Sequence, residues 1–253
     1  MTSADASSTE VSALAPAETP SADNLLELRK IRASYDGIDV LYGVDLVVPR
    51  GSVVALLGPN GAGKTTTLRV ASGLHAPSSG DVIVAGRRVN GARPEELART
   101  GFCLVPEGRG IFPNLSVREN LRMMTYSGRS QQHVEDVTFE RFPRLRERRA
   151  QVAGTLSGGE QQMLAMARGL ATEPALLLLD ELSMGLAPII VEELYEIVAQ
   201  IARDGVSILV VEQFARTVLG AADYAAIMVH GRIAKVGRPD ELEAELSTAY
   251  LGA

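Results

Sequence analysis

The sequence contains a single cysteine, Cys103, among its 253 residues. One cysteine excludes an intramolecular disulfide and a zinc site built from several cysteines, which fits a reducing compartment. Cys103 lies in the apolar stretch GFCLVP, where we interpret it as a small core residue. With 46% hydrophobic residues, the chain can form a substantial core, either in one α/β domain with an insertion or in two small domains.

Long hydrophobic runs and a basic excess are also missing. A membrane-spanning helix needs about 18 or more consecutive apolar residues, whereas candidates such as ALLLL at 175–179 have the length of buried strands. The net charge of −6 includes −4 from residues 1–24, which contain four acidic and no basic residues, so −6 minus −4 leaves −2 for the rest. This small charge gives no electrostatic support for nucleic-acid binding.

Residues 1–24 lack the basic region and apolar stretch with which a secretory signal begins. They are rich in Ala, Ser, Thr and Pro. This composition predicts a disordered acidic extension, and we do not expect export.

The rest of the chain shows apolar segments separated by Gly and Pro. The segments 25–35 and 40–51 predict strands of a small sheet, with which the strands expected in 77–89 pair. Further along, continuously apolar strands alternate with helices, which indicates a parallel sheet covered on both faces. Residues 93–152 are more helical and predict an inserted subdomain, and 225–237 predict a closing hairpin.

Residues 58–65, GPNGAGKT, match the pattern G-x-x-x-x-G-K-[ST] between an apolar strand and a helix. In that setting backbone N–H groups surround phosphate oxygens, and the helix N-terminus adds partial positive charge. Lys64 would reach the β- and γ-phosphates, and the Thr65 hydroxyl would ligate Mg²⁺. An incidental glycine-rich turn is the alternative.

Two carboxylates, Asp180 and Glu181, end the apolar strand ALLLLDE. Ligands of parallel sheets bind beyond the carboxyl ends of the strands. Asp180 is suited to holding Mg²⁺ directly or through water, and Glu181 to orienting and deprotonating an attacking water. Without a phosphate loop in the same chain, the pair would read as an ordinary strand end.

The stretch TLSGGEQQMLAMARGL at 155–170 predicts a second well-defined helix start. Ser157 and Glu160 have the spacing of a capping box. Gly158 and Gly159 leave backbone N–H groups open to a phosphate. Two anion-binding helix starts exceed what one nucleotide needs within a monomer.

These motifs, in this order and spacing, resemble the ATP-binding subunit of ABC transporters over residues 25–253. The resemblance implies an α/β fold: a P-loop NTPase (RecA-like) core with an antiparallel β subdomain and an inserted α-helical subdomain. It also implies ATP and Mg²⁺ as cofactors. Two subunits would pack head to tail, so that the signature of one meets the γ-phosphate held by the other.

The resemblance assigns roles residue by residue. Glu181 would be the general base, with Lys64 and Gln213 as further catalytic residues. Tyr35 would stack on adenine, although a half-buried strand residue is the alternative. The nucleotide-binding residues are Tyr35, Gly58, Pro59, Asn60, Gly61, Ala62, Gly63, Lys64, Thr65 and Thr66. The signature residues are Leu156, Ser157, Gly158, Gly159, Glu160 and Gln161. The metal ligands are Thr65, Asp180 and Glu107.

Four positions depart from the family pattern. Glu107 stands where a Gln couples the nucleotide site to the membrane partner, and a carboxylate can meet Mg²⁺ or its water but cannot donate as an amide does. Gln213 stands where a His is expected at the γ-phosphate, and it supplies an amide donor but no positive charge. Leu182 replaces a Pro before the loop 183–188, and Phe214 replaces an Asn.

The stretches VPEGRGIFPNLSVREN, GLAPIIVEEL and VVEQ narrow the resemblance to branched-chain amino acid importers. Urea or short-chain amide importers more often have PQGR, so Glu107 favours amino acids. The implied function is ATP hydrolysis that drives import through transmembrane permeases, supplied by an extracytoplasmic amino-acid-binding protein. The subunit would lie peripherally at the cytoplasmic face of the plasma membrane, as a homodimer or with a second ATP-binding subunit. A weakly hydrolysing dimerisation module, suggested by Gln213, is the alternative.

The arginine-rich segment 141–149 has two interpretations. It is a solvated helical face, or it contacts a cytoplasmic helix of the permease or acidic lipid. Just before it in the chain, Ser116 and Glu119 form another capping box. The following Met123 and Met124 belong either to the core or to a partner-facing surface.

Overall fold

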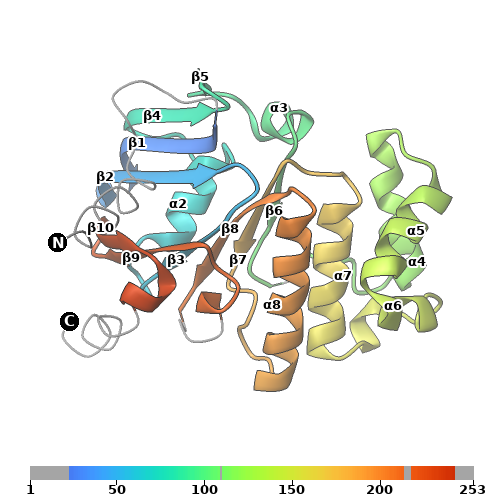
Figure 1. Ribbon diagram of the computed structural model, residues 1–253. Helices are drawn as coiled ribbons and strands as arrows, with labels where there is room; N and C mark the ends of the chain where they lie inside the picture. The colour runs from blue at the N-terminus through green and yellow to red at the C-terminus, as the bar shows by residue number, and fades with distance from the viewer. Residues whose placement is uncertain (1–22, 109, 214–217, 243–253) are drawn as a thin grey trace.

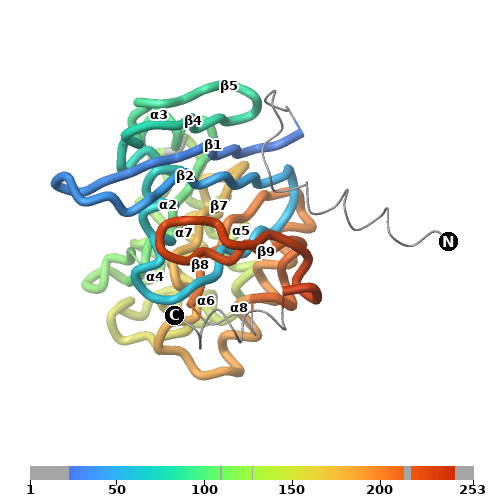
Figure 2. The backbone as a smooth tube through the Cα atoms, turned by 90° about the vertical axis from the view of Figure 1, so that its left-hand side faces the viewer, coloured from blue at the N-terminus to red at the C-terminus, as the bar shows by residue number. Residues whose placement is uncertain are grey.

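The computed structural model describes residues 23–108, 110–213 and 218–242 of the chain. Their strands form a four-stranded and a six-stranded sheet. Helix α2 (Lys64–Ala71) contacts strands of both sheets and lies between them, as Figure 1 shows. In the view turned by 90°, the small sheet lies at one end of the molecule and helices α6 and α8 at the other (Figure 2).

The small sheet is antiparallel, with the order β2-β1-β4-β5. Its strands are β1 (Asn24–Tyr35), β2 (Ile38–Pro49), β4 (Ser79–Val84) and β5 (Arg87–Arg88). Buried Leu and Val side chains of β1 and β2 pack towards α2, which explains why these strands are half apolar. The small sheet predicted from the first segments is thereby confirmed.

The large sheet has the order β10-β9-β3-β8-β7-β6 and is parallel from β9 to β6. Its strands are β3 (Val53–Leu57), β6 (Phe102–Val105), β7 (Leu176–Asp180), β8 (Ser207–Glu212), β9 (Tyr224–Val229) and β10 (Arg232–Gly237). The last two strands pair as the predicted antiparallel hairpin. Strand β8 lies between β3 and β7 and is parallel to both. The carboxyl ends of all three strands therefore lie at one edge of the sheet, where ligands of such sheets bind.

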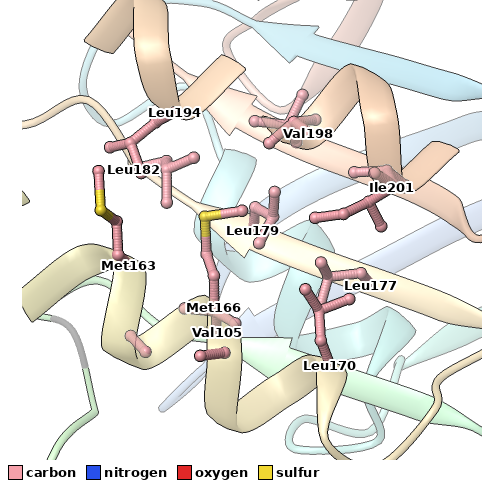
Figure 3. Close-up of a cluster of buried hydrophobic side chains, with 14 of the residues drawn as sticks. Val105, Met163, Met166, Leu170, Leu177, Leu179, Leu182, Leu194, Val198 and Ile201 are labelled. Carbon is pink, nitrogen blue, oxygen red and sulfur yellow. The ribbon is translucent and has the colours of Figure 1, made fainter. Parts of the chain in front are cut away.

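Both faces of the large sheet are covered, so its central strands are apolar throughout. Alternate side chains of β3 enter two separate clusters: Val54 and Leu56 pack towards α2, and Val53, Ala55 and Leu57 face the other helices. Those helices are α7 (Gly158–Leu170) and α8 (Pro188–Arg203). Figure 3 shows this second cluster, formed by Val105, Met163, Met166, Leu170, Leu177, Leu179, Leu182, Leu194, Val198 and Ile201.

The inserted helices pack on α7 on the side away from the sheet (Figure 1). They are α4 (Val117–Arg122), η2 (Met123–Ser127), α5 (Gln131–Arg141), α6 (Pro143–Glu147) and η3 (Ala153–Thr155). Within the span 93–152, α3 (Pro94–Arg99) and β6 precede them, and β6 belongs to the large sheet. Across residues 23–108, 110–213 and 218–242, every helix is too short or too polar to span a bilayer.

Most arginines of the arginine-rich segment form ion pairs with acidic residues of the same chain. Ion pairs join Arg141 to Asp204 at 2.7 Å, Arg144 to Glu193 at 3.1 Å and Arg148 to Glu160 at 2.5 Å. Exposed pairs of this kind contribute only about 0–1 kcal/mol each, but these three connect the insertion to α7, to α8 and to the residue that follows α8. The pairing supports a structural role for the segment.

The two methionines of the insertion differ in their surroundings. Met124 is buried in the core, whereas the Met123 side chain is 50% exposed. The capping box before them is confirmed, because the Ser116 hydroxyl accepts from Glu119 N and the Glu119 carboxylate accepts from Ser116 N. Met124 is therefore a core residue, and Met123 faces outward.

Candidate nucleotide site

The phosphate loop connects β3 to α2, and α2 begins at Lys64. Gly63 has a φ of +105°, and a Cβ there would lie 2.8 Å from the Leu41 side chain. Only glycine meets both the left-handed backbone and the close approach. Lys64 N and the following N–H groups therefore face the loop as the free helix N-terminus that binds anions.

The Lys64 ammonium folds back over the loop. It donates to the carbonyl oxygens of Gly58 at 2.9 Å and Pro59 at 3.1 Å, and it lies 3.8 Å from Glu181 Oε1. Burial lowers the pKa of Lys64, and the carboxylates of Glu181 and Asp180 partly offset that effect. The same donors can pass from these carbonyls to phosphate oxygens, since an ammonium accepts no hydrogen bond and has three to give.

Asp180 ends β7 beside the phosphate loop. Its Oδ1 accepts a hydrogen bond from the Thr65 hydroxyl at 3.2 Å. The pKa of Asp180 is raised to about 6, chiefly by burial. The hydrogen bond from Thr65 and the charge of Lys64 oppose this shift, whereas the carboxylates of Glu181 and Glu107 add to it. An excess of negative charge is thus gathered where a cation would neutralise it.

An open cleft of about 340 Å³ brings together several of the residues assigned from sequence. Its lining includes part of the phosphate loop, the start of α2, Glu107 and Glu181, whereas Asp180 adjoins it through Thr65. Hydroxyl and carboxylate oxygens are the ligands that Mg²⁺ prefers, and Mg²⁺ keeps several waters and substrate oxygens besides. The oxygens of Thr65, Asp180 and Glu107 fit that preference, although the described residues hold no cluster of three or more His, Cys, Asp or Glu suited to binding a metal unaided.

Glu181 has a backbone conformation that residues other than glycine rarely adopt. Its φ is +48°, in the left-handed region, where a non-glycine residue is strained by about 1–3 kcal/mol. Its N–H donates to the carbonyl of Val211 in β8 at 2.9 Å. Such strain is typical of residues whose side chain has a required direction.

Gln213 lies beside Glu181 at the end of β8. Both residues line a neighbouring cleft of about 250 Å³, together with the loop 183–188. Leu182, which stands in place of the expected Pro, is buried in the core below that loop. Phe214 lies outside the described residues.

Tyr35 does not line the phosphate cleft. Its ring stacks on His75, with centroids 4.3 Å apart and an interplanar angle of 28°. The Tyr35 hydroxyl and His75 Nε2 are both buried without a hydrogen-bond partner in the described structure. Adenine stacking at Tyr35 stays a prediction.

The signature residues 156–161 form the start of α7 and do not line the phosphate cleft either. The capping box is confirmed: Ser157 N donates to Glu160 Oε2 at 2.9 Å and Glu160 N to Ser157 Oγ at 3.4 Å. A Cβ on Gly159 would come within 2.3 Å of Ile190 Cγ2 in α8. Packing inside the subunit therefore requires Gly159, independently of any phosphate.

Sequence reasoning passed over Glu212, the last residue of β8. It is 1% exposed and accepts hydrogen bonds from Ser183 and Tyr195. Burial raises its pKa, and the hydrogen bonds from Tyr195 and Ser183 oppose that shift. The available signal was an acidic residue ending a strand that is otherwise wholly apolar.

A sequence profile of the ABC transporter family matches residues 41–183, which contain the phosphate loop, the start of α7 and both carboxylates. The chain belongs to the ABC transporter family. The membership confirms the predicted recognition, fold and class: an ABC ATPase that binds and hydrolyses ATP. The roles of single residues are not tested by it and stay predictions.

Known relatives of this ABC ATPase match it over most of its length. The high-affinity branched-chain amino acid transport ATP-binding protein BraG of Pseudomonas aeruginosa is 41% identical over 90% of this chain and 100% of its own. The probable branched-chain amino acid transport ATP-binding protein LivF of Archaeoglobus fulgidus is 35% identical over 86% and 94%. A crystal structure of an ATP-binding cassette in its ADP conformation has a TM-score of 0.82 at 24% identity, covering 91% of this chain and 99% of that one, which shows a shared fold.

Proposed function

We propose that this ABC ATPase hydrolyses ATP with Mg²⁺ to drive import of branched-chain amino acids through partner permeases. The observation that carries the proposal is a pair of contacts at one cleft: Lys64 lies 3.8 Å from Glu181, and Thr65, which lines the same cleft, donates a hydrogen bond to Asp180. Similarity to BraG over nearly the whole chain supports the choice of substrate class. The subunit would lie at the cytoplasmic face of the membrane that holds the permeases.

Each group in the cleft has one task in the proposed reaction. The phosphate loop and Lys64 bind the β- and γ-phosphates, and Lys64 exchanges its carbonyl partners for phosphate oxygens. Bound Mg²⁺ would neutralise charge on the phosphates, held by Thr65 and Asp180 with Glu107 nearby. Glu181 orients the attacking water and takes its proton.

The site is completed by a second ATP-binding subunit in this proposal. The start of α7 offers free N–H groups and an exposed Ser157, yet it lines no part of the cleft of its own subunit. A head-to-tail pair would bring this helix start to the γ-phosphate of the other subunit, where its N–H groups and dipole stabilise the anion. Gln213 would donate its amide to the same phosphate.

Transport by the assembled complex tests the proposal. The chain would be reconstituted in vesicles with its permeases and an amino-acid-binding protein, and ATP-dependent uptake of labelled leucine, isoleucine and valine would be compared with uptake of urea. Amino acid uptake that stops with Lys64→Ala is expected. Uptake of urea alone would instead assign the chain to an amide importer, and ATP binding without phosphate release would identify a dimerisation module.

A further inference from the structure

The strained turn at Glu181 is held from strand β8 at two points. The Glu181 N–H donates to the Val211 carbonyl at 2.9 Å. Two residues further on, Ser183 N donates to Glu212 Oε1 at 2.8 Å and the Ser183 hydroxyl to Glu212 Oε2 at 2.7 Å. The left-handed residue is thus bracketed by contacts with consecutive residues of β8.

Glu212 also connects this turn to helix α8. The Tyr195 hydroxyl donates to Glu212 Oε1 at 2.5 Å, and Tyr195 is only 3% exposed. Burying a carboxylate is costly unless donors satisfy it, and the donors named here are neutral. One buried carboxylate therefore joins β8, the turn 181–183 and α8 next to Gln213.

We propose that Glu212 is a positioning residue for the hydrolytic reaction. It ties Ser183 and Tyr195 to the end of β8, which keeps Glu181 in its left-handed conformation and its carboxylate directed at the water. The inference rests on the proposed role of Glu181. Glu212 lines the neighbouring cleft together with Glu181 and Gln213 and does not line the phosphate cleft, so we expect its loss to affect turnover more than nucleotide binding.

The pattern of hydrogen bonds predicts which substitutions are tolerated. In Glu212→Gln, the amide oxygen can still accept from Ser183 N and Tyr195, and the amide nitrogen can donate to the Ser183 hydroxyl. Glu212→Leu keeps a similar volume but offers no acceptor. The leucine variant should release the turn, whereas the glutamine variant should retain it.

Steady-state phosphate release by the assembled transporter tests the proposal. Glu212→Leu is expected to lower kcat by about 10- to 100-fold through misplacement of Glu181, with the KM for ATP within about twofold, and Glu212→Gln to restore kcat to within about threefold of wild type. The matched control is Glu27→Leu, the same change at a buried carboxylate of β1, which should leave kcat unchanged. A wild-type kcat in Glu212→Leu, or an equal loss in the glutamine variant, would overturn the proposal.

Two further variants keep the test decisive. If Glu212→Leu does not fold, the double variant Ser183→Ala with Tyr195→Phe removes both hydroxyl donors, keeps the carboxylate and leaves only the backbone N–H of residue 183 as its donor. This variant should lower kcat at constant KM, and an unchanged kcat would reject a positioning role for the two hydroxyl contacts. Glu181→Gln is measured alongside. Full turnover in Glu181→Gln would refute the proposed general base, whereas loss in that variant beside full activity in Glu212→Leu would refute only the positioning role.

Discussion

The Thr65 hydroxyl donates to Asp180 Oδ1 at 3.2 Å, although 115 positions separate the two residues. The contact joins the end of the phosphate loop to the end of β7 across β8. A hydroxyl and a carboxylate at this distance offer two oxygens to one Mg²⁺. The pair is the point at which nucleotide and metal binding meet.

Removing the negative charge of Asp180 should change the metal requirement. In Asp180→Asn the charge that attracts Mg²⁺ is lost, so half-maximal ATP hydrolysis should need at least about tenfold more Mg²⁺. Thr65→Ser keeps the hydroxyl and should need a nearly normal concentration. A magnesium titration of phosphate release measures both, with the remote variant Asp204→Asn as control. An unchanged Mg²⁺ requirement in Asp180→Asn would show that Asp180 is not a metal ligand.

Glu181→Gln should separate binding from chemistry. The amide keeps the size of the side chain but cannot accept the proton of water, so kcat should fall by about 10²- to 10⁴-fold. ATP affinity should stay within about twofold of wild type, because the phosphate loop and Lys64 carry binding. Single-turnover hydrolysis and nucleotide titration check the two values, with the exposed Glu173→Gln as the control. Normal turnover in Glu181→Gln would show that another residue is the general base.

Gly159→Ala should destabilise the subunit without any nucleotide present. Its added methyl would meet Ile190 Cγ2 at 2.3 Å, and overpacking of this kind costs about 1–3 kcal/mol. Adding Ile190→Ala should recover part of the loss by making room. Thermal or urea unfolding of the isolated chain measures the change. Gly220→Ala, where a Cβ meets nothing within 4 Å, should leave the unfolding midpoint unchanged.

Cys103 should be a poor nucleophile in the folded chain. Burial raises its pKa to about 11 from an ordinary value of 9.0, so the thiolate fraction at pH 8 is lower by roughly 100-fold. Native alkylation should be correspondingly slow and should accelerate in urea. Because the unfolded thiol ionises first, its titration should also favour unfolding as the pH rises above about 9. Rapid labelling of the native protein would contradict the assigned burial.

Local patterns were sufficient for the elements that carry the chemistry. The phosphate loop, both capping boxes and the apolar strands each lie within a short stretch, where hydrogen bonding and periodicity act between near neighbours. The predicted layers follow because continuously apolar strands must be covered on both faces. For the same reason the resemblance to ABC transporters could be recognised before any contact was known.

Other features depended on partners far along the chain. Met123 and Met124 differ in burial because only Met124 packs in the hydrophobic core. Three arginines of 141–149 pair with acidic residues on α7, on α8 and at Asp204 just after α8. The phosphate contact of Gly159 stays a prediction, whereas its close approach to Ile190 is a separate reason for glycine that only the structure shows. The space around a side chain and its hydrogen-bond partners are set by residues that come together only in the folded chain.

By itself, the sequence determined that this chain is an α/β nucleotide-binding ATPase, because a phosphate loop, a capped signature helix and paired carboxylates are each local motifs. Only the tertiary structure decided how those parts are held. The buried carboxylate of Glu212 is satisfied by hydrogen bonds from Ser183, 29 positions away, and from Tyr195, 17 positions away. A buried carboxylate is explained by the donors that satisfy it, and those donors become neighbours only when β8, the turn after β7 and α8 pack together.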